Sequence, residues 1–236
     1  MNNKRVSVIM PAYNESKYIE KSLKMYKSQD CSSLEIIVVD NSTDDGKTFK
    51  IAKKYADKII SFPYPIGLSN ARNEGAKAAT GEIFIFSDAD SYVEQGGIKK
   101  ILQITDENTV GTLSGRGDNG NIRGKIFFRF KNLIHWLRIY QGVGGGVLFC
   151  HRKVYFNAGG FDSKKEPAEL FNFVKNAKNS GAKYKVLFNC YATTSLRRYE
   201  EKGYFNVILS WIKWRICSFL AKENKVFINY FNLKDK

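Results

Sequence analysis

The chain has 236 residues, 43% of them hydrophobic, which suits one domain with a substantial core followed by a tail. Its formal net charge of +15, from 38 basic and 23 acidic residues, indicates an anionic partner such as nucleic acid, anionic lipid or a phosphorylated substrate. The sequence has no signal-peptide pattern and no uncharged apolar run near the roughly 20 residues of a membrane span, so we expect a cytoplasmic chain. Its four cysteines form no CxxC motif and no Cys/His cluster, so we expect neither a disulfide framework nor a zinc site.

Apolar strands alternate with helical patterns along the first 90 residues. The predicted strands are residues 6–10, 34–39, 58–62 and 83–86, and helical spacing of apolar residues marks 19–26, 49–55 and 68–80. This alternation predicts an α/β fold, a mostly parallel sheet with helices on both faces. Further along, we expect a helix near 98–104, a strand near 110–113 and a polar loop over 115–124.

Two carboxylates follow the fourth predicted strand, in the sequence Asp88-Ala89-Asp90. Residues two apart on extended chain point the same way, so Asp88 and Asp90 are predicted to face one ligand while Ala89 turns into the protein. Paired carboxylate oxygens suit Mg²⁺ or Mn²⁺, which takes one or two protein carboxylates and completes its shell with water and substrate phosphates. The alternative is an ordinary Asp-rich turn after a buried strand.

Two other polar loops strengthen the interpretation as a binding site. They are residues 11–15 after the first strand and 40–46 after the second. In a parallel sheet, ligands bind outside the carboxyl ends of the strands, so all three loops are predicted to share one rim.

The ordered motifs resemble family 2 glycosyltransferases of the GT-A (Rossmann-like) fold, including the type that uses dolichol or polyprenol phosphate. The resemblance is close over residues 5–92 and looser through Gly159-Gly160-Phe161-Asp162. It is carried by Val8-Ile9-Met10-Pro11-Ala12-Tyr13-Asn14-Glu15, Val38-Val39-Asp40-Asn41-Ser42-Thr43-Asp44, Gly67, Ala71-Arg72-Asn73, Gly75 and Asp88-Ala89-Asp90.

The resemblance implies a nucleotide-sugar site, with a UDP- or GDP-linked donor. It implies that Asp88 touches the ribose, Asp90 binds Mn²⁺ or Mg²⁺ and takes part in catalysis, and Arg72 lies near the base or diphosphate; a surface position on its helix is the alternative for Arg72. Contacts with the nucleotide are implied for Pro11, Ala12, Tyr13, Glu15, Asp40 and Ala89. The later basic stretch that contains Arg197 and Arg198 resembles one that meets a diphosphate or an acceptor phosphate.

The chain departs from the family where an acidic pair normally supplies the general base. Aligning Glu166 with the first acid places Pro167 at the position of the basic aspartate, and proline accepts no proton. A sugar hydroxyl acceptor needs a base, whereas an acceptor phosphate is already an anionic nucleophile. Glu166 or Glu169 can substitute as base, although Glu169 also fits the ordinary role of an acid in the first turn of a helix.

Two basic, aromatic segments, residues 122–138 and 204–220, resemble helices that lie on a membrane surface. For residues 122–138, a core helix with a solvated basic edge is the alternative. We predict a glycosyltransferase domain over residues 1–200, with a nucleotide-binding half (1–92) and an acceptor half (93–200), and an amphipathic helical tail over 201–236. The protein is expected at the inner face of the cell membrane, as a peripheral protein.

The predicted activity is metal-dependent, inverting transfer of a sugar to a membrane-presented, lipid-linked acceptor, and a polyprenyl phosphate is the acceptor that we expect. One alternative is transfer to the sugar hydroxyl of a lipid-linked saccharide or a polysaccharide, with Glu166 as base. Another is a non-catalytic module that binds sugar nucleotides. A nucleotidyltransferase is disfavoured because no Gly-rich basic loop follows Met10, and we expect no nucleic-acid partner because the chain has no nucleic-acid-binding motif.

Overall fold

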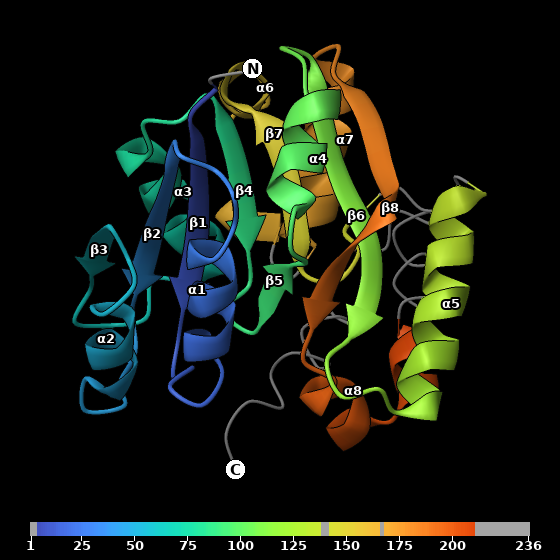
Figure 1. Cartoon of the computed structure of the whole chain (residues 1–236), viewed down its shortest axis with the longest axis horizontal. Coiled ribbons are helices and arrows are strands. Elements are labelled where there is room, and N and C mark those ends of the chain that lie inside the picture. Colours follow the sequence, from blue (N-terminus) through green and yellow to red (C-terminus); the bar gives the residue numbers. More distant parts are fainter. Residues whose placement is uncertain (1–3, 138–141, 166–167, 211–236) are drawn as a thin grey trace.

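The computed structural model describes residues 4–137, 142–165 and 168–210 (Figure 1). The strands of the described residues are β1 (Val6–Ala12), β2 (Leu34–Asp40), β3 (Lys58–Ser61), β4 (Ile83–Ser87), β5 (Ser91–Val93), β6 (Thr109–Gly117), β7 (Val147–His151) and β8 (Lys183–Thr194). The helices are α1 (Ile19–Lys27), α2 (Lys47–Ala52), α3 (Leu68–Ala78), α4 (Gly97–Ile104), α5 (Ile122–Trp136), α6 (Arg152–Asn157), α7 (Glu169–Asn179) and α8 (Arg197–Lys202), with a 3₁₀ turn at Ser163–Lys165.

All of these strands lie in one sheet, in the order β3-β2-β1-β4-β7-β6-β8-β5. The pairs β1–β2, β1–β4, β2–β3 and β6–β8 are parallel, whereas β7 is antiparallel to β4 and β6, and β5 is antiparallel to β8. The predicted α/β fold with a mostly parallel sheet is therefore confirmed. The predicted loop over 115–124 is wrong at both ends, because β6 pairs with β8 as far as Gly117 and α5 begins at Ile122.

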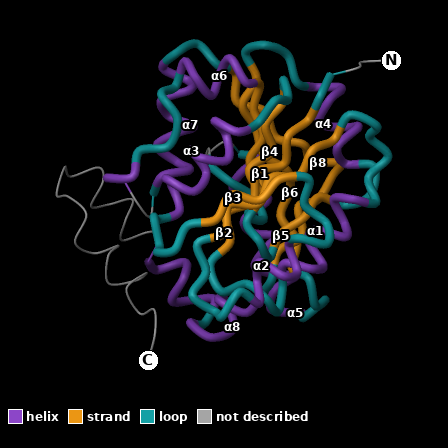
Figure 2. The backbone as a smooth tube through the Cα atoms, turned by 90° about the vertical axis from the view of Figure 1, so that its left-hand side faces the viewer, coloured by secondary structure: helices purple, strands orange, loops and turns teal. Residues whose placement is uncertain are grey.

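Helices cover both faces of the sheet (Figure 2). On one face, α1, α2 and α4 bury residues such as Leu23 and Ile101 against side chains of alternate strand positions, including Val8 and Val38. On the other face, α3, α6 and α7 pack against the intervening positions, among them Ile9. Every residue of β1 and β4 is buried, which explains why their sequences are continuously apolar rather than alternating.

A third, smaller core joins α5 to α8 and to the residues on either side of α8. Phe127 and Phe128 of α5 pack against Leu196 and Val207, with Tyr199 and Tyr204 at the margin. The two aromatic segments predicted to act together thus contact each other where both are described. No helix among the described residues is both long and apolar enough to cross a bilayer.

Candidate active site

The carboxyl ends of β1, β2 and β4 form one rim, as the sequence predicts. Ala12 is the register partner of Asp40, so the loops after β1 and β2 begin side by side. Hydrogen bonds join these loops: the Asn14 amide donates to Ser42 Oγ at 2.9 Å, and the Thr43 amide donates to Asn14 Oδ1 at 2.9 Å. Asp40 is buried and its Oδ1 accepts from the Ser42 amide at 3.2 Å. This rim has a fixed backbone before any ligand binds.

Residues 88–90 form a turn, so the extended-chain geometry predicted for Asp88 and Asp90 is wrong. The Ser91 amide donates to the Asp88 carbonyl at 2.9 Å and closes the turn. The Asp88 amide donates to the Gly146 carbonyl at 3.1 Å. Gly146 has a φ of 74°, and a Cβ there would collide with Ser91 Oγ and lie 3.0 Å from Asp88 Oδ2. The glycines that precede β7 therefore let the backbone approach the acidic turn closely.

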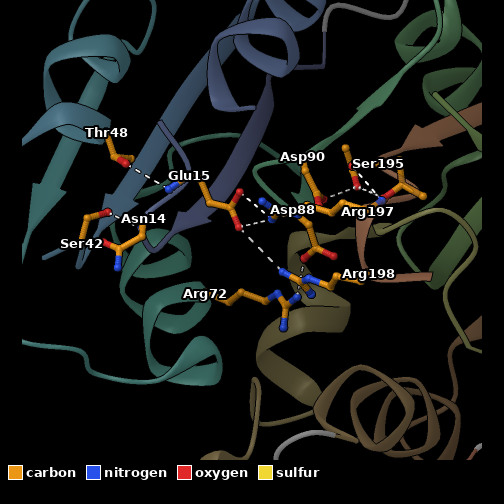
Figure 3. Close-up of polar contacts among 12 residues, drawn as sticks. Asn14, Glu15, Ser42, Thr48, Arg72, Asp88, Asp90, Ser195, Arg197 and Arg198 are labelled. Carbon is orange, nitrogen blue, oxygen red and sulfur yellow. Dashed lines mark hydrogen bonds and ion pairs between the residues drawn. The ribbon is translucent and has the colours of Figure 1, made fainter. Parts of the chain in front are cut away.

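Asp90 faces Glu15 across the rim, and Arg197 lies between them (Figure 3). Arg197 Nη2 is 2.5 and 2.7 Å from the two Glu15 carboxylate oxygens and 3.3 Å from Asp90 Oδ2. The guanidinium also lies 4.0 Å from the centre of the Tyr18 ring. Arg198 Nη2 is 3.7 Å from Glu15 Oε1. The structure thus brings together four residues that the sequence placed in the site, from positions as distant as 15 and 198.

The backbone fixes this arrangement, because the Ser195 amide donates to the Asp90 carbonyl at 3.1 Å. The side chain of Asp90 is only 8% exposed. Burial raises the pKa of the Asp90 carboxyl, an effect that Arg198 and Arg197 oppose and Asp88 reinforces. Burial likewise raises the pKa of Glu15, opposed by its hydrogen bond with Arg197. Two acids held in so little water favour a bound cation, a role that Arg197 fills in this structure.

Arg72 is buried, so the alternative of a surface charge is wrong. It is 1% exposed, and Nη1 donates to Glu169 Oε1 at 2.6 Å while Nη2 donates to Asp88 Oδ1 at 2.8 Å. Burial raises the pKa of Glu169, and the Arg72 guanidinium opposes that shift. Glu169 does stand in the first turn of α7, but its bond to Arg72 is a role that sequence reasoning missed. No local pattern signals it, since the two residues are 97 positions apart.

The remaining candidates lie at the rim or outside the described residues. Pro11, Ala12 and Ala89 are buried, and Tyr13 is half-buried. Lys131 of α5 faces inward; burial lowers the pKa of its amine to about 8, and the Asp88 carboxylate opposes that shift, so the amine is within electrostatic range of the site. Glu166 and Pro167 lie outside the described residues. The two histidines make their contacts away from the acidic turn. His151 accepts a hydrogen bond from the Lys153 amide and so caps α6, and His135 lies near Tyr184.

A comparison with protein families decides the relationship. The model of Glycosyl transferase family 2 matches residues 7–201. The chain belongs to this family. The match extends from β1 to the end of α8 and includes every described residue of the rim.

Several named glycosyltransferases are similar to this chain over part of their length. The GalNAc(5)-diNAcBac-PP-undecaprenol beta-1,3-glucosyltransferase of Campylobacter jejuni is 35% identical over 108 residues, which are 44% of this chain and 35% of that protein. An uncharacterized glycosyltransferase of Bacillus subtilis, EpsJ, is 36% identical over 107 residues, 44% of this chain and 31% of that protein. The chain thus matches about a third of the length of these relatives.

Solved structures share the fold of this family 2 member. The mannosyltransferase PcManGT of Pyrobaculum calidifontis, in complex with GDP-Man and Mn²⁺, superposes with a TM-score of 0.68 at 22% identity, covering 82% of this chain and 57% of that chain. S. aureus TarS 1-349, in complex with UDP-GlcNAc, gives a TM-score of 0.63 at 24% identity, covering 80% and 58%. At these identities the likeness establishes the GT-A fold, as the motifs predicted.

Proposed function

We propose that this chain is an inverting glycosyltransferase that moves a sugar from a nucleotide-sugar donor to a lipid-linked acceptor presented at a membrane surface. The observation that carries the proposal is the convergence of Asp90, Glu15, Arg197 and Arg198 at the rim where β1, β2 and β4 end. The acids suit the ribose and a cation, and the arginines suit phosphate oxygens, so together they suit a nucleoside diphosphate. The buried carboxylate of Asp40 is placed to accept hydrogen bonds from the base or ribose.

We propose Mn²⁺ or Mg²⁺ as the cofactor, held by Asp90. These ions take one or two protein carboxylates and complete their shell with water and substrate phosphates. Asp90 suits this role, because burial disfavours its ionised form and a nearby cation stabilises the carboxylate. The ion supplies positive charge to the leaving diphosphate. With a cation beside Asp90, Arg197 would be available to bind phosphate oxygens, and its two bonds to Glu15 would hold it at the rim.

We propose a polyprenyl-type lipid phosphate as the acceptor, because Pro167 occupies the position of the family's basic aspartate. Glu169 is unsuited to be the base, since it is buried and bound to Arg72. A phosphate acceptor needs positive charge instead of a base, and Arg198, which is 56% exposed, is available to supply it. The second candidate is transfer to the hydroxyl of a lipid-linked saccharide with Glu166 as base, which the name of the Campylobacter jejuni relative favours.

Glu166→Gln is expected to change kcat less than about threefold if the acceptor is a lipid phosphate. The rate should rise with pH near ~6, where a phosphate monoester loses its second proton, and not with the titration of a carboxyl group. The measurement supplies labelled UDP- and GDP-sugars with either polyprenyl phosphate or a lipid-linked saccharide. Exclusive use of the saccharide, together with a large defect in Glu166→Gln, would establish the second candidate in place of the first. Failure to use any acceptor or hydrolyse any donor would contradict both.

Asp40→Ala is expected to raise the donor KM about tenfold or more and to leave kcat within about threefold, because a hydrogen bond to a charged group is worth about 1.5–3 kcal/mol. Among the described residues, the Asp40 carboxylate accepts only from the Ser42 amide, so it has free acceptor capacity for the donor. Steady-state kinetics with varied donor tests this. Asp30→Ala, at an exposed aspartate just after α1, is the control and should leave both constants unchanged. A defect confined to kcat would show that Asp40 acts in the chemical step.

A further inference from the structure

The surface of α5 that faces away from the protein exposes large apolar residues along the whole helix. Six large apolar residues lie there, and each is at least 48% exposed: Ile122, Ile126, Phe130, Leu133, Trp136 and Leu137. Apart from Trp136, they follow one another at intervals of four, four, three and four residues, which places them on one side of the helix. We call them the α5 stripe. In Figure 1, α5 stands at the margin of the molecule beside β8, with its N-terminal end near α8. Single exposed apolar residues are common on soluble proteins, but a continuous stripe of this length marks an interaction surface.

The distribution of charge on α5 is the reverse of that on a helix of a soluble protein. Its inward side contains Lys131 and His135, both buried, together with Phe127 and Phe128. Its outward side contains the stripe, with the exposed side chains of Arg123 and Lys125 at its borders and that of Arg129 within it. The helix has no acidic residue. Basic residues beside an exposed apolar stripe are the composition of helices that lie in the headgroup layer of an anionic membrane.

The inward side fixes how α5 is oriented. Asn132 Oδ1 accepts from the Gly115 amide at 2.8 Å, and Asn132 Nδ2 donates to the Gly115 carbonyl at 3.0 Å, which ties the helix to β6. Near its start, the helix contacts Leu196 so closely at Gly124 that a Cβ would collide with the leucine side chain. Rotation of the helix to bury the stripe would break these contacts, so its exposure is built into the fold.

We propose that the α5 stripe inserts into the headgroup layer of an anionic bilayer and so holds the active-site rim at the membrane surface. The partner is an anionic lipid surface because the stripe is bordered by cations and the chain has a net charge of +15. Insertion would bring the site close to an acceptor in the membrane, since Leu196, which packs on α5, directly precedes Arg197 at the rim. This role in presenting the acceptor rests on the proposed function, whereas insertion itself can be tested without donor or acceptor.

The test uses the full chain with Trp211→Phe and Trp214→Phe, which leaves Trp136 as the one tryptophan, and sucrose-loaded vesicles of phosphatidylglycerol or of phosphatidylcholine alone. Insertion predicts co-sedimentation with the anionic vesicles, a blue shift of Trp136 emission, and quenching by lipids brominated near the headgroup. Ile126→Glu/Phe130→Glu in this background should weaken partitioning about tenfold or more, because two apolar side chains lose their transfer free energy. Lys175→Glu, on α7, lowers the net charge by the same two units and is the matched control.

The control should bind vesicles within about threefold of the parent. Equal losses in the control and the double variant, or binding without a change in Trp136 emission, would show that adsorption is purely electrostatic and overturn insertion of the stripe. A dimer in sedimentation velocity that the double variant abolishes would identify a second copy as the partner instead. Melting curves with UDP and GDP, recorded on the same variants, keep the two proposals separate: retained nucleotide binding without vesicle binding contradicts this inference alone.

Discussion

Asp90→Asn is expected to lower kcat/KM about a hundred- to a thousandfold and to abolish the gain in donor affinity from Mn²⁺. Asparagine has the shape of aspartate and can still accept the bond that Ser91 Oγ donates to Asp90 Oδ1 at 3.2 Å, so the turn should be preserved. What is lost is the negative charge beside Arg197 and, as proposed, beside the cation. A cation or preorganised dipole placed at developing charge typically contributes this much.

The pH dependence provides a second measurement of the same residue. Burial raises the pKa of Asp90 above its usual value of 3.8, so its carboxylate is protonated at a higher pH than that of an exposed aspartate. Metal-dependent nucleotide binding, followed by calorimetry, should therefore weaken as the pH falls through that raised pKa. Asp90→Asn should show no such dependence. Asp106→Asn, just before β6 at the opposite end of the sheet, is the control and should keep the pH dependence of the parent. Full metal-dependent activity in Asp90→Asn would exclude Asp90 as the ligand of the metal.

Arg72→Met is expected to destabilise the protein by about 3–5 kcal/mol at neutral pH, because it leaves the carboxylate of Glu169 buried without its partner. The same change frees Asp88 Oδ1 at the acidic turn, so donor affinity should also fall. Chemical unfolding measures the first effect and calorimetry with nucleotide the second. Lys77→Met is the matched control on the same helix: its pair with Glu74 is exposed, so its loss should cost less than about 1 kcal/mol.

Two further results would identify the buried carboxylate as the cause. Without Arg72, the pKa of Glu169 should rise further above its unfolded value of about 4.5, so the folded state binds more protons than the unfolded state. The free energy of unfolding of Arg72→Met should then fall as the pH rises through that window, and the defect should be smaller at low pH. Adding Glu169→Leu should restore part of the lost stability. A pH-independent defect that Glu169→Leu does not relieve would assign the effect to packing alone.

The sequence predicted the parts of the site that depend on local pattern. Continuous apolar runs identified β1, β2 and β4, and the rule that ligands bind at the carboxyl ends of parallel strands placed Asp40 and Asp90 on one rim. Their detailed geometry did not follow, because the turn at residues 88–90 is closed by a backbone bond and by Gly146, which lies beyond two further strands of sequence.

The contacts that the sequence did not reveal are long-range. Glu169 reaches Arg72, and Arg197 reaches Glu15, from the far half of the chain. Both depend on β7 entering the sheet antiparallel between β4 and β6, whereas the alternation of strands and helices predicts parallel neighbours. The orientation of α5 was also left open, because both of its sides contain aromatic residues and only the contacts of Asn132 and Gly124 decide which one faces inward.

Because neighbouring strands of the sheet are distant in sequence, some strands leave the ribosome well before the strands that pair with them. When β1 to β4 have emerged, one edge of β4 is unpaired until β7 is made about 60 residues later, a delay of several seconds at roughly 5–20 residues per second. β5 waits longer, since its partner residues in β8 are about 100 positions downstream. A largely apolar strand with an unpaired edge is prone to intermolecular pairing. Synthesis of this protein should therefore depend on chaperones that shield the edge of β4, and truncation before β7 should yield aggregates instead of a nucleotide-binding fragment.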